Sequence, residues 1–89
     1  MLKIKEDRMQ ELKNFDYYKH DYSGNYQKNL EYAPIKGSTN IRTITKSIFI
    51  TLKDRCVYYC DGNSQTFATI DNPYIQDLIL NDMVEKGGE

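Results

Sequence analysis

The chain has 89 residues and a net charge of −1, with 39% hydrophobic and 28% charged residues. This composition describes one small globular domain spanning residues 1–89 and excludes disordered, fibrous and collagen-like proteins. No run of aliphatic or phenylalanine residues is longer than three. We therefore expect neither a membrane span nor a signal peptide, and the cytoplasm is the default compartment.

Charge is distributed unevenly along the chain. Residues 1–60 contain eleven Lys or Arg and seven Asp or Glu, whereas residues 61–89 contain one Lys and six Asp or Glu. This gradient suits internal pairing between an acidic helix and a basic sheet, or a partner surface of mixed charge. It suits a nucleic-acid binder with a global positive excess less well.

Residues 1–5 alternate between apolar and basic side chains, which is typical of a short edge strand or of a frayed helix start. The next segment predicts a short helix over residues 7–13. Asp7 and Gln10 have the spacing of a capping box, and apolar side chains then recur at every third position. Asn14 is expected to close this helix in a left-handed conformation.

Tyrosine is the most distinctive feature of the composition, with eight residues and no tryptophan, and five of the eight lie between residues 17 and 32. A Ser-Gly-Asn turn at 23–25 divides this window, which predicts a hairpin with arms at 16–22 and 26–32. Proline, glycine and asparagine in residues 34–40 then predict a loop.

This tyrosine-rich hairpin carries the candidate binding residues. Tyrosine offers a large contact area at a low cost in conformational entropy, so a polar segment rich in tyrosine is typical of a contact surface. The alternative is that the rings cover a thin core, since a small domain has few apolar residues to spare. The predicted binding residues are Tyr17, Tyr18, Lys19, Tyr22, Tyr26 and Lys28.

Residues 44–60 have the clearest strand pattern, with a polar turn at 53–55. If the loop holds an even number of residues, cross-strand pairing places Val57 on the same face as Ile50, together with Tyr59. The other face then holds Phe49, Cys56, Tyr58 and Cys60. The predicted core residues are Ile48, Ile50, Leu52, Val57, Leu78 and Ile79.

The two cysteines, Cys56 and Cys60, are predicted to be free thiols. Four residues along a strand separate them by roughly 13 Å, which exceeds the limit of about 7 Å for a disulfide. Two thiols and one distant histidine are too few ligands for zinc, so no cofactor or metal is expected.

In the C-terminal part we expect a short strand at 65–70, which is followed by the clearest helix signal. Asn72 is a favourable N-cap and Pro73 a favourable first helical residue. Apolar residues then follow helical spacing, and two glycines at 87–88 supply a stop. An earlier break near Asn81 would leave residues 83–86 extended.

No residue pattern indicates catalysis, so we expect a protein that is not an enzyme. His20 and Asp21 are sequence neighbours on a strand, and their side chains point to opposite faces. Glycines are scattered rather than gathered in a phosphate-binding loop. Basic residues interleave with the tyrosines, a mixture that single-strand nucleic-acid binders also use. These basic residues are Lys19, Lys28, Lys36, Arg42, Lys46, Lys53 and Arg55.

The two ends of the chain, LKIKEDRMQELKNF at 2–15 and IQDLILNDMVEK at 75–86, resemble small proteins encoded by phages and prophages of low-GC Gram-positive bacteria. This resemblance implies a compact accessory protein that binds and blocks a host protein, as anti-CRISPR proteins do. It assigns no functional residues.

Taken together, these patterns predict an α+β domain: an antiparallel sheet of three to five strands with a C-terminal helix and a short N-terminal helix packed on one face. The expected function is non-catalytic binding of a host or phage protein, such as inhibition of a host defence nuclease, through the tyrosine-rich hairpin. The alternative is nucleic-acid binding by the same aromatic and basic surface. No membrane partner is expected.

Overall fold

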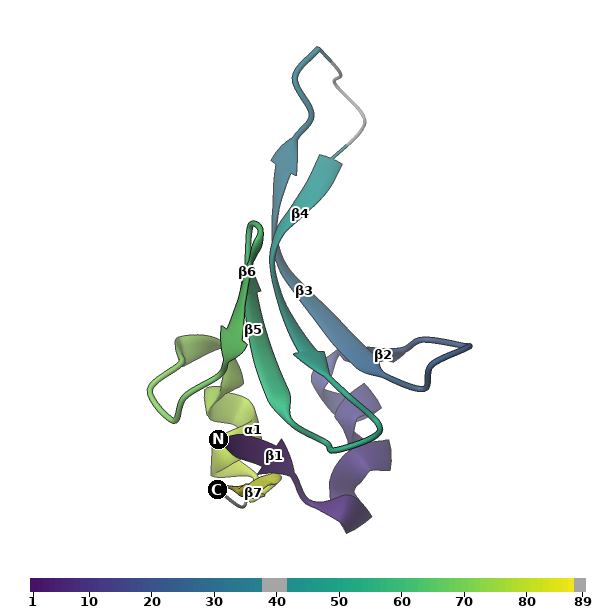
Figure 1. The fold of residues 1–89 in the computed structure, drawn as a ribbon, viewed down its shortest axis with the longest axis vertical. Helices are drawn as coiled ribbons and strands as arrows, with labels where there is room; N and C mark the ends of the chain where they lie inside the picture. The colour runs from purple at the N-terminus through teal and green to yellow at the C-terminus, as the bar shows by residue number, and fades with distance from the viewer. Residues whose placement is uncertain (38–41, 88–89) are drawn as a thin grey trace.

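The computed structural model describes residues 1–37 and 42–87, and it shows the expected α+β architecture (Figure 1). Five antiparallel strands form the main sheet in the order β2-β3-β4-β5-β6, and β1 and β7 form a separate two-stranded sheet. The elements are β1 (Leu2–Ile4), the 3₁₀ helix η1 (Glu6–Phe15), β2 (Tyr18–Lys19), β3 (Tyr26–Pro34), β4 (Arg42–Ile50), β5 (Val57–Asp61), β6 (Ser64–Phe67), the 3₁₀ turn η2 (Pro73–Ile75), α1 (Gln76–Leu80) and β7 (Val84–Lys86).

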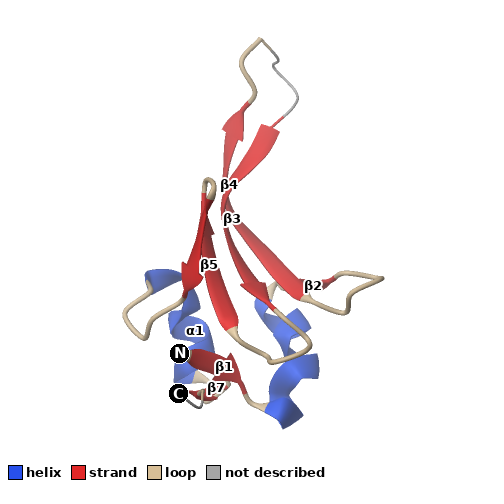
Figure 2. Ribbon diagram, in the orientation of Figure 1, coloured by secondary structure: helices blue, strands red, loops and turns tan. Residues whose placement is uncertain are grey.

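The helices and the β1–β7 sheet gather at one end of the main sheet (Figure 2). They bury one continuous core against it, which supplies the main stabilisation of so small a chain. The core side chains are Ile4, Met9, Leu12, Tyr17, Tyr26, Ile48, Ile50, Val57, Ala68, Ile75, Leu78 and Met83. At the other end, β3 and β4 continue as a two-stranded arm beyond the β5–β6 turn (Figure 1).

The N-terminal helix is longer than predicted and ends differently. It is a 3₁₀ helix with Met9 and Leu12 buried, but no side chain caps its start, so the expected role of Asp7 and Gln10 is wrong. The left-handed residue is Asp16 (φ 70°), whose N–H donates to the carbonyl of Leu12, and not Asn14. Half-buried Phe15 packs against the core, which extends the helix past the predicted stop.

The tyrosine-rich hairpin is present, although its first arm is short. Only Tyr18 and Lys19 pair with β3, opposite Gln27 and Tyr26. The turn between the arms is closed by a bond from the Gly24 N–H to the His20 carbonyl, and Gly24 adopts φ 76°. The predicted loop covers residues 34–40. Its first residue, Pro34, is the last residue of β3, and its positions 38–40 lie outside the described residues.

The register between β4 and β5 confirms the predicted faces. Ile50 lies opposite Val57, and Ile48 lies opposite Tyr59. Leu52, by contrast, is 51% exposed, so its place in the predicted core is wrong. β4 ends at Ile50, and Leu52 therefore belongs to the turn, where its side chain lies against Gly24.

The C-terminal helix ends early, near Asn81, as one of the two sequence-based alternatives expected. The Asn72 side chain accepts a 2.8 Å hydrogen bond from the Tyr74 N–H, as expected of an N-cap, but α1 already ends at Leu80. Residues Val84–Lys86 then pair with Leu2–Ile4, which also confirms the edge-strand reading of the N-terminus. Met83 lies between α1 and β7, not on a helix, and its side chain is fully buried.

Ion pairs explain part of the charge gradient. Lys5 pairs with Asp82 at 2.8 Å, Lys28 with Asp77 at 3.5 Å and Arg55 with Glu85 at 3.3 Å. Each pair joins the basic part of the chain to the acidic last third. Of these three, only the Lys28–Asp77 pair joins the C-terminal helix to the main sheet, as the first sequence-based alternative expected; the other two pairs involve turns and β7.

Candidate functional site

One face of the main sheet is left uncovered by the helices, and we call it the open face. Side chains alternate across a sheet, so the strands that bury Ile48, Ile50 and Val57 present their intervening residues on the opposite side. The open face is composed of Tyr18, His20, Gln27, Asn29, Ser47, Phe49, Tyr58, Cys60, Gln65 and Phe67.

Aromatic rings form a row across this face. The ring centroids of Tyr18 and His20 are 5.3 Å apart, and those of His20 and Phe49 are 5.9 Å apart. Phe49 lies directly opposite Tyr58, which stacks on Phe67 at 5.1 Å. Contacts at these distances are favourable ring pairs. The row therefore runs from the β2 edge of the sheet to the β6 edge.

A chain of side-chain hydrogen bonds supports the β2 end of the row. His20 Nε2 lies 2.9 Å from Gln27 Oε1, the Gln27 amide donates to Asn29 Oδ1 at 2.7 Å, and the Asn29 amide lies 3.4 Å from the Tyr18 hydroxyl. Because a carbonyl oxygen only accepts, a hydrogen bond between His20 Nε2 and Gln27 Oε1 requires the imidazole Nε2 to be the donor. The network therefore links the side chains of His20 and Tyr18, which are both partly exposed.

The open face carries no Lys, Arg, Asp or Glu on the described strands. This is unusual for a solvated sheet face, because charged residues make up 28% of the chain. Aromatic enrichment together with charge depletion is the composition of an interface core. The arrangement is suited to binding; among the described residues, His20 is hydrogen-bonded to Gln27, and the Cys60 thiol is directed to Gln65.

The six predicted binding residues lie in different environments, and only some of them are exposed. Tyr17 and Tyr26 are core residues, 3% and 7% exposed, so these two rings are not a contact surface in the folded protein. Lys28 is committed internally, because its ammonium pairs with Asp77 and lies 5.5 Å from the centre of the Tyr17 ring. Burial raises the pKa of Tyr17 well above its ordinary value, with the Asp77 carboxylate as a second cause.

The remaining three predicted residues are exposed. Tyr18 begins the aromatic row, and Tyr22 projects fully into solvent from the β2–β3 turn. Lys19 points to the other side of β2 from Tyr18. The hairpin thus contributes one end of the open face instead of forming a surface by itself.

Four members of the row were not predicted as site residues: His20, Phe49, Tyr58 and Phe67. The sequence did indicate the position of two of them, since alternation along the strands predicted that Phe49 and Tyr58 lie on the face away from the core. The contribution of His20 and Phe67 depends on strand order, because it is the pairing of β2 with β3 and of β5 with β6 that aligns them.

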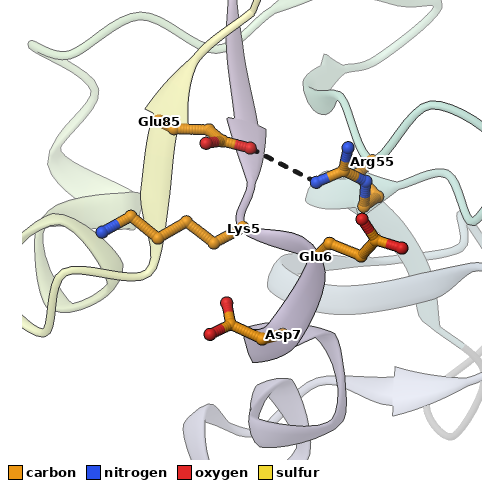
Figure 3. A pocket seen from close by; sticks show the side chains of 5 residues that line it. All are labelled: Lys5, Glu6, Asp7, Arg55 and Glu85. Atoms are coloured by element: carbon orange, nitrogen blue, oxygen red, sulfur yellow. Dashed lines mark hydrogen bonds and ion pairs between the residues drawn. The ribbon is translucent and has the colours of Figure 1, made fainter.

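A hollow of about 610 Å³, away from the open face, is lined by the charged residues Lys5, Glu6, Asp7, Arg55 and Glu85 (Figure 3). Arg55 joins the two sheets there, since its guanidinium donates to the Ile4 carbonyl at 2.8 Å and to Glu85. Among the described residues, no group of three or more His, Cys, Asp or Glu is placed to hold a metal. This hollow is a structural junction.

Both cysteines are free, and they differ in environment. Cys60 is half-exposed on the open face, whereas Cys56 is buried, and burial followed by the Asp54 carboxylate raises the pKa of its thiol. We expect a thiol reagent at pH 8 to label Cys60 quickly and Cys56 slowly, because the thiolate is the reactive form. Denatured, non-reduced protein should show two thiols, and Cys60→Ser should remove the fast phase. Equal rates for the two thiols would contradict this placement.

No helix among the described residues is long and apolar enough to cross a membrane. Comparisons with models of protein families, with curated proteins and with solved structures found no significant match. The resemblance of the chain ends to phage-encoded proteins therefore stays a prediction, and the open face is the feature from which a function is inferred.

Proposed function

We propose that this chain is a non-catalytic protein-binding module and that the open face is its binding surface. The observation that carries the proposal is the row of five aromatic rings on a sheet face whose described strand residues include no charged side chain. Aromatic side chains supply most of the energy in protein interfaces, and charged residues are depleted at interface centres. Neutral amides beside the row can hydrogen-bond to a partner backbone.

The same composition favours a protein over a nucleic acid as the partner. A surface that stacks bases also needs cations to neutralise the phosphates. The open face has none on the described strands, and Lys28 and Arg55 are engaged in ion pairs elsewhere. With a net charge of −1, the chain as a whole offers no compensating field.

The partner class follows from the resemblance of the chain ends to phage-encoded accessory proteins. We propose a host protein, such as a defence nuclease, that is blocked when it is bound. A stoichiometric complex formed from purified components would support this function. Affinity capture from the source organism followed by calorimetry of the isolated pair is the direct test.

Replacing Tyr58 by alanine should weaken binding of that partner by about 2 kcal/mol or more, since Tyr58 lies within the row, between Phe49 and Phe67, and hot spots concentrate away from the rim of an interface. Tyr32→Ala is the matched control, because Tyr32 is an exposed tyrosine on the arm, outside the row. Titration calorimetry gives both affinities, and circular dichroism verifies that both variants fold.

Two results would contradict the proposal. Equal affinities for the two variants would show that the partner does not use the open face. Binding of single-stranded oligonucleotides with an affinity that falls steeply with salt would instead support the nucleic-acid alternative, because counterion release makes phosphate binding salt-dependent.

A further inference from the structure

We propose that a groove at the β6 end of the open face binds the C-terminal residue of a partner protein, with an apolar side chain in the groove and its carboxylate beside Lys86. The inference rests on the proposed function, because it treats the groove as a continuation of the binding surface. It names a feature that the partner must have: an apolar terminal residue.

The groove has a volume of about 480 Å³, within the range of small-ligand sites. Its walls come from three segments that are distant in sequence: the start of β1, the end of β6 with the following loop, and β7. The lining residues are Met1, Leu2, Phe67, Ala68, Thr69, Ile70 and Lys86.

The apolar walls are exposed while the floor is buried. Met1, Phe67 and Ile70 are 51%, 45% and 63% exposed, whereas Ala68 is only 2% exposed. Three large apolar side chains around one hollow form a patch of the kind that marks an interaction site. An apolar side chain of a partner would cover all three and remove their surface from water.

Phe67 connects the groove to the proposed binding surface. Its ring lies in the groove wall and also stacks on Tyr58, the next ring of the aromatic row. A partner segment that covers Tyr58 and Phe67 therefore also contacts the wall of the groove. One continuous contact serves both.

Lys86 specifies the charge of the occupant. It is the one charged side chain in the lining, and it has no ion-pair partner among residues 1–37 and 42–87. A lysine attracts a carboxylate as a point charge. The groove thus calls for an apolar side chain and a carboxylate close to each other. The C-terminal residue of a protein carries both on the same Cα atom, which makes it the most compact occupant.

The test is an amide-shift NMR titration of the full chain with N-acetyl-L-phenylalaninate, which carries both groups. We expect saturable shifts that concentrate on residues 67–70 and 86. N-acetyl-phenylalaninamide, which lacks the charge, should bind about two- to fivefold more weakly, as suits one exposed ion pair. The blocked dipeptide amide of Phe and Asp, with an internal acid, should resemble this uncharged probe.

Two variants locate the site. Lys86→Gln should remove the difference between the charged and uncharged probes, while Lys53→Gln, on the exposed β4–β5 turn, should preserve it. Ile70→Asp should abolish binding of the phenylalaninate, and its exposure means that the fold tolerates the change. Shifts that are absent, or that follow all lysines equally, would overturn the groove proposal. If Tyr58→Ala still weakened the partner complex in that case, the proposed function would stand without it.

Discussion

Tyr17→Ala is expected to destabilise the domain by about 3–5 kcal/mol, the usual range for removal of a buried aromatic ring. Tyr17 is 3% exposed within the core, and its backbone N–H donates to the Leu12 carbonyl where η1 ends. Loss of the ring leaves a cavity between the helix and the sheet and removes the ring surface that faces Lys28. Urea denaturation followed by circular dichroism measures the change in the free energy of unfolding.

Tyr17→Phe is the matched control and should leave stability unchanged or raise it slightly. The Tyr17 hydroxyl is buried without a hydrogen-bond partner among the described residues, so its removal relieves a desolvation cost of about 1 kcal/mol or more. An unchanged midpoint for Tyr17→Ala would place the ring outside the core. Strong destabilisation by Tyr17→Phe would show that the hydroxyl has a partner in solution.

Leu78→Ala is expected to cost about 2–4 kcal/mol, because Leu78 is fully buried on α1 and truncation leaves a cavity. Its carbonyl also accepts a hydrogen bond from the N–H of Met83, the buried residue that leads into β7. A loosened α1 would therefore disturb the β1–β7 sheet as well. Thermal and urea denaturation both report this loss.

Leu80→Ala provides the comparison on the same helix. Leu80 is 83% exposed, so the same truncation should change stability by less than about 0.5 kcal/mol. Similar losses at both positions would mean that α1 presents another face to the sheet. No effect at either position would mean that the helix is not docked.

The cluster of tyrosines shows where sequence reasoning reached its limit. The tyrosine-rich arms and the turn between them correctly indicated a hairpin. The tyrosines themselves differ in burial, since Tyr17 and Tyr26 are buried, while Tyr18 and Tyr22 are exposed. One residue along a strand reverses the face of a side chain. Which face is covered depends on where η1 and α1 dock, and no local pattern encodes that position.

The open face could be predicted in part. Alternation in β4 and β5 placed Phe49 and Tyr58 together and away from the core, and the register confirms this arrangement. Their extension into a row required the order of strands in the sheet, which brings His20 and Phe67 into line from segments 47 residues apart. Sequence periodicity describes a strand, whereas a site that crosses strands depends on their pairing.

The sequence by itself determined the class of fold, the alternation of faces in residues 44–60, the capped start at Asn72 and the burial of Leu78. These features follow from short-range alternation and capping, which act over a few residues. Only the tertiary structure decided that Leu52 is exposed, that Tyr17 is core, and that β1 and β7 pair. Each of these outcomes depends on contacts between distant segments, which the packing of the whole chain selects because it buries the most apolar surface with its backbone groups paired.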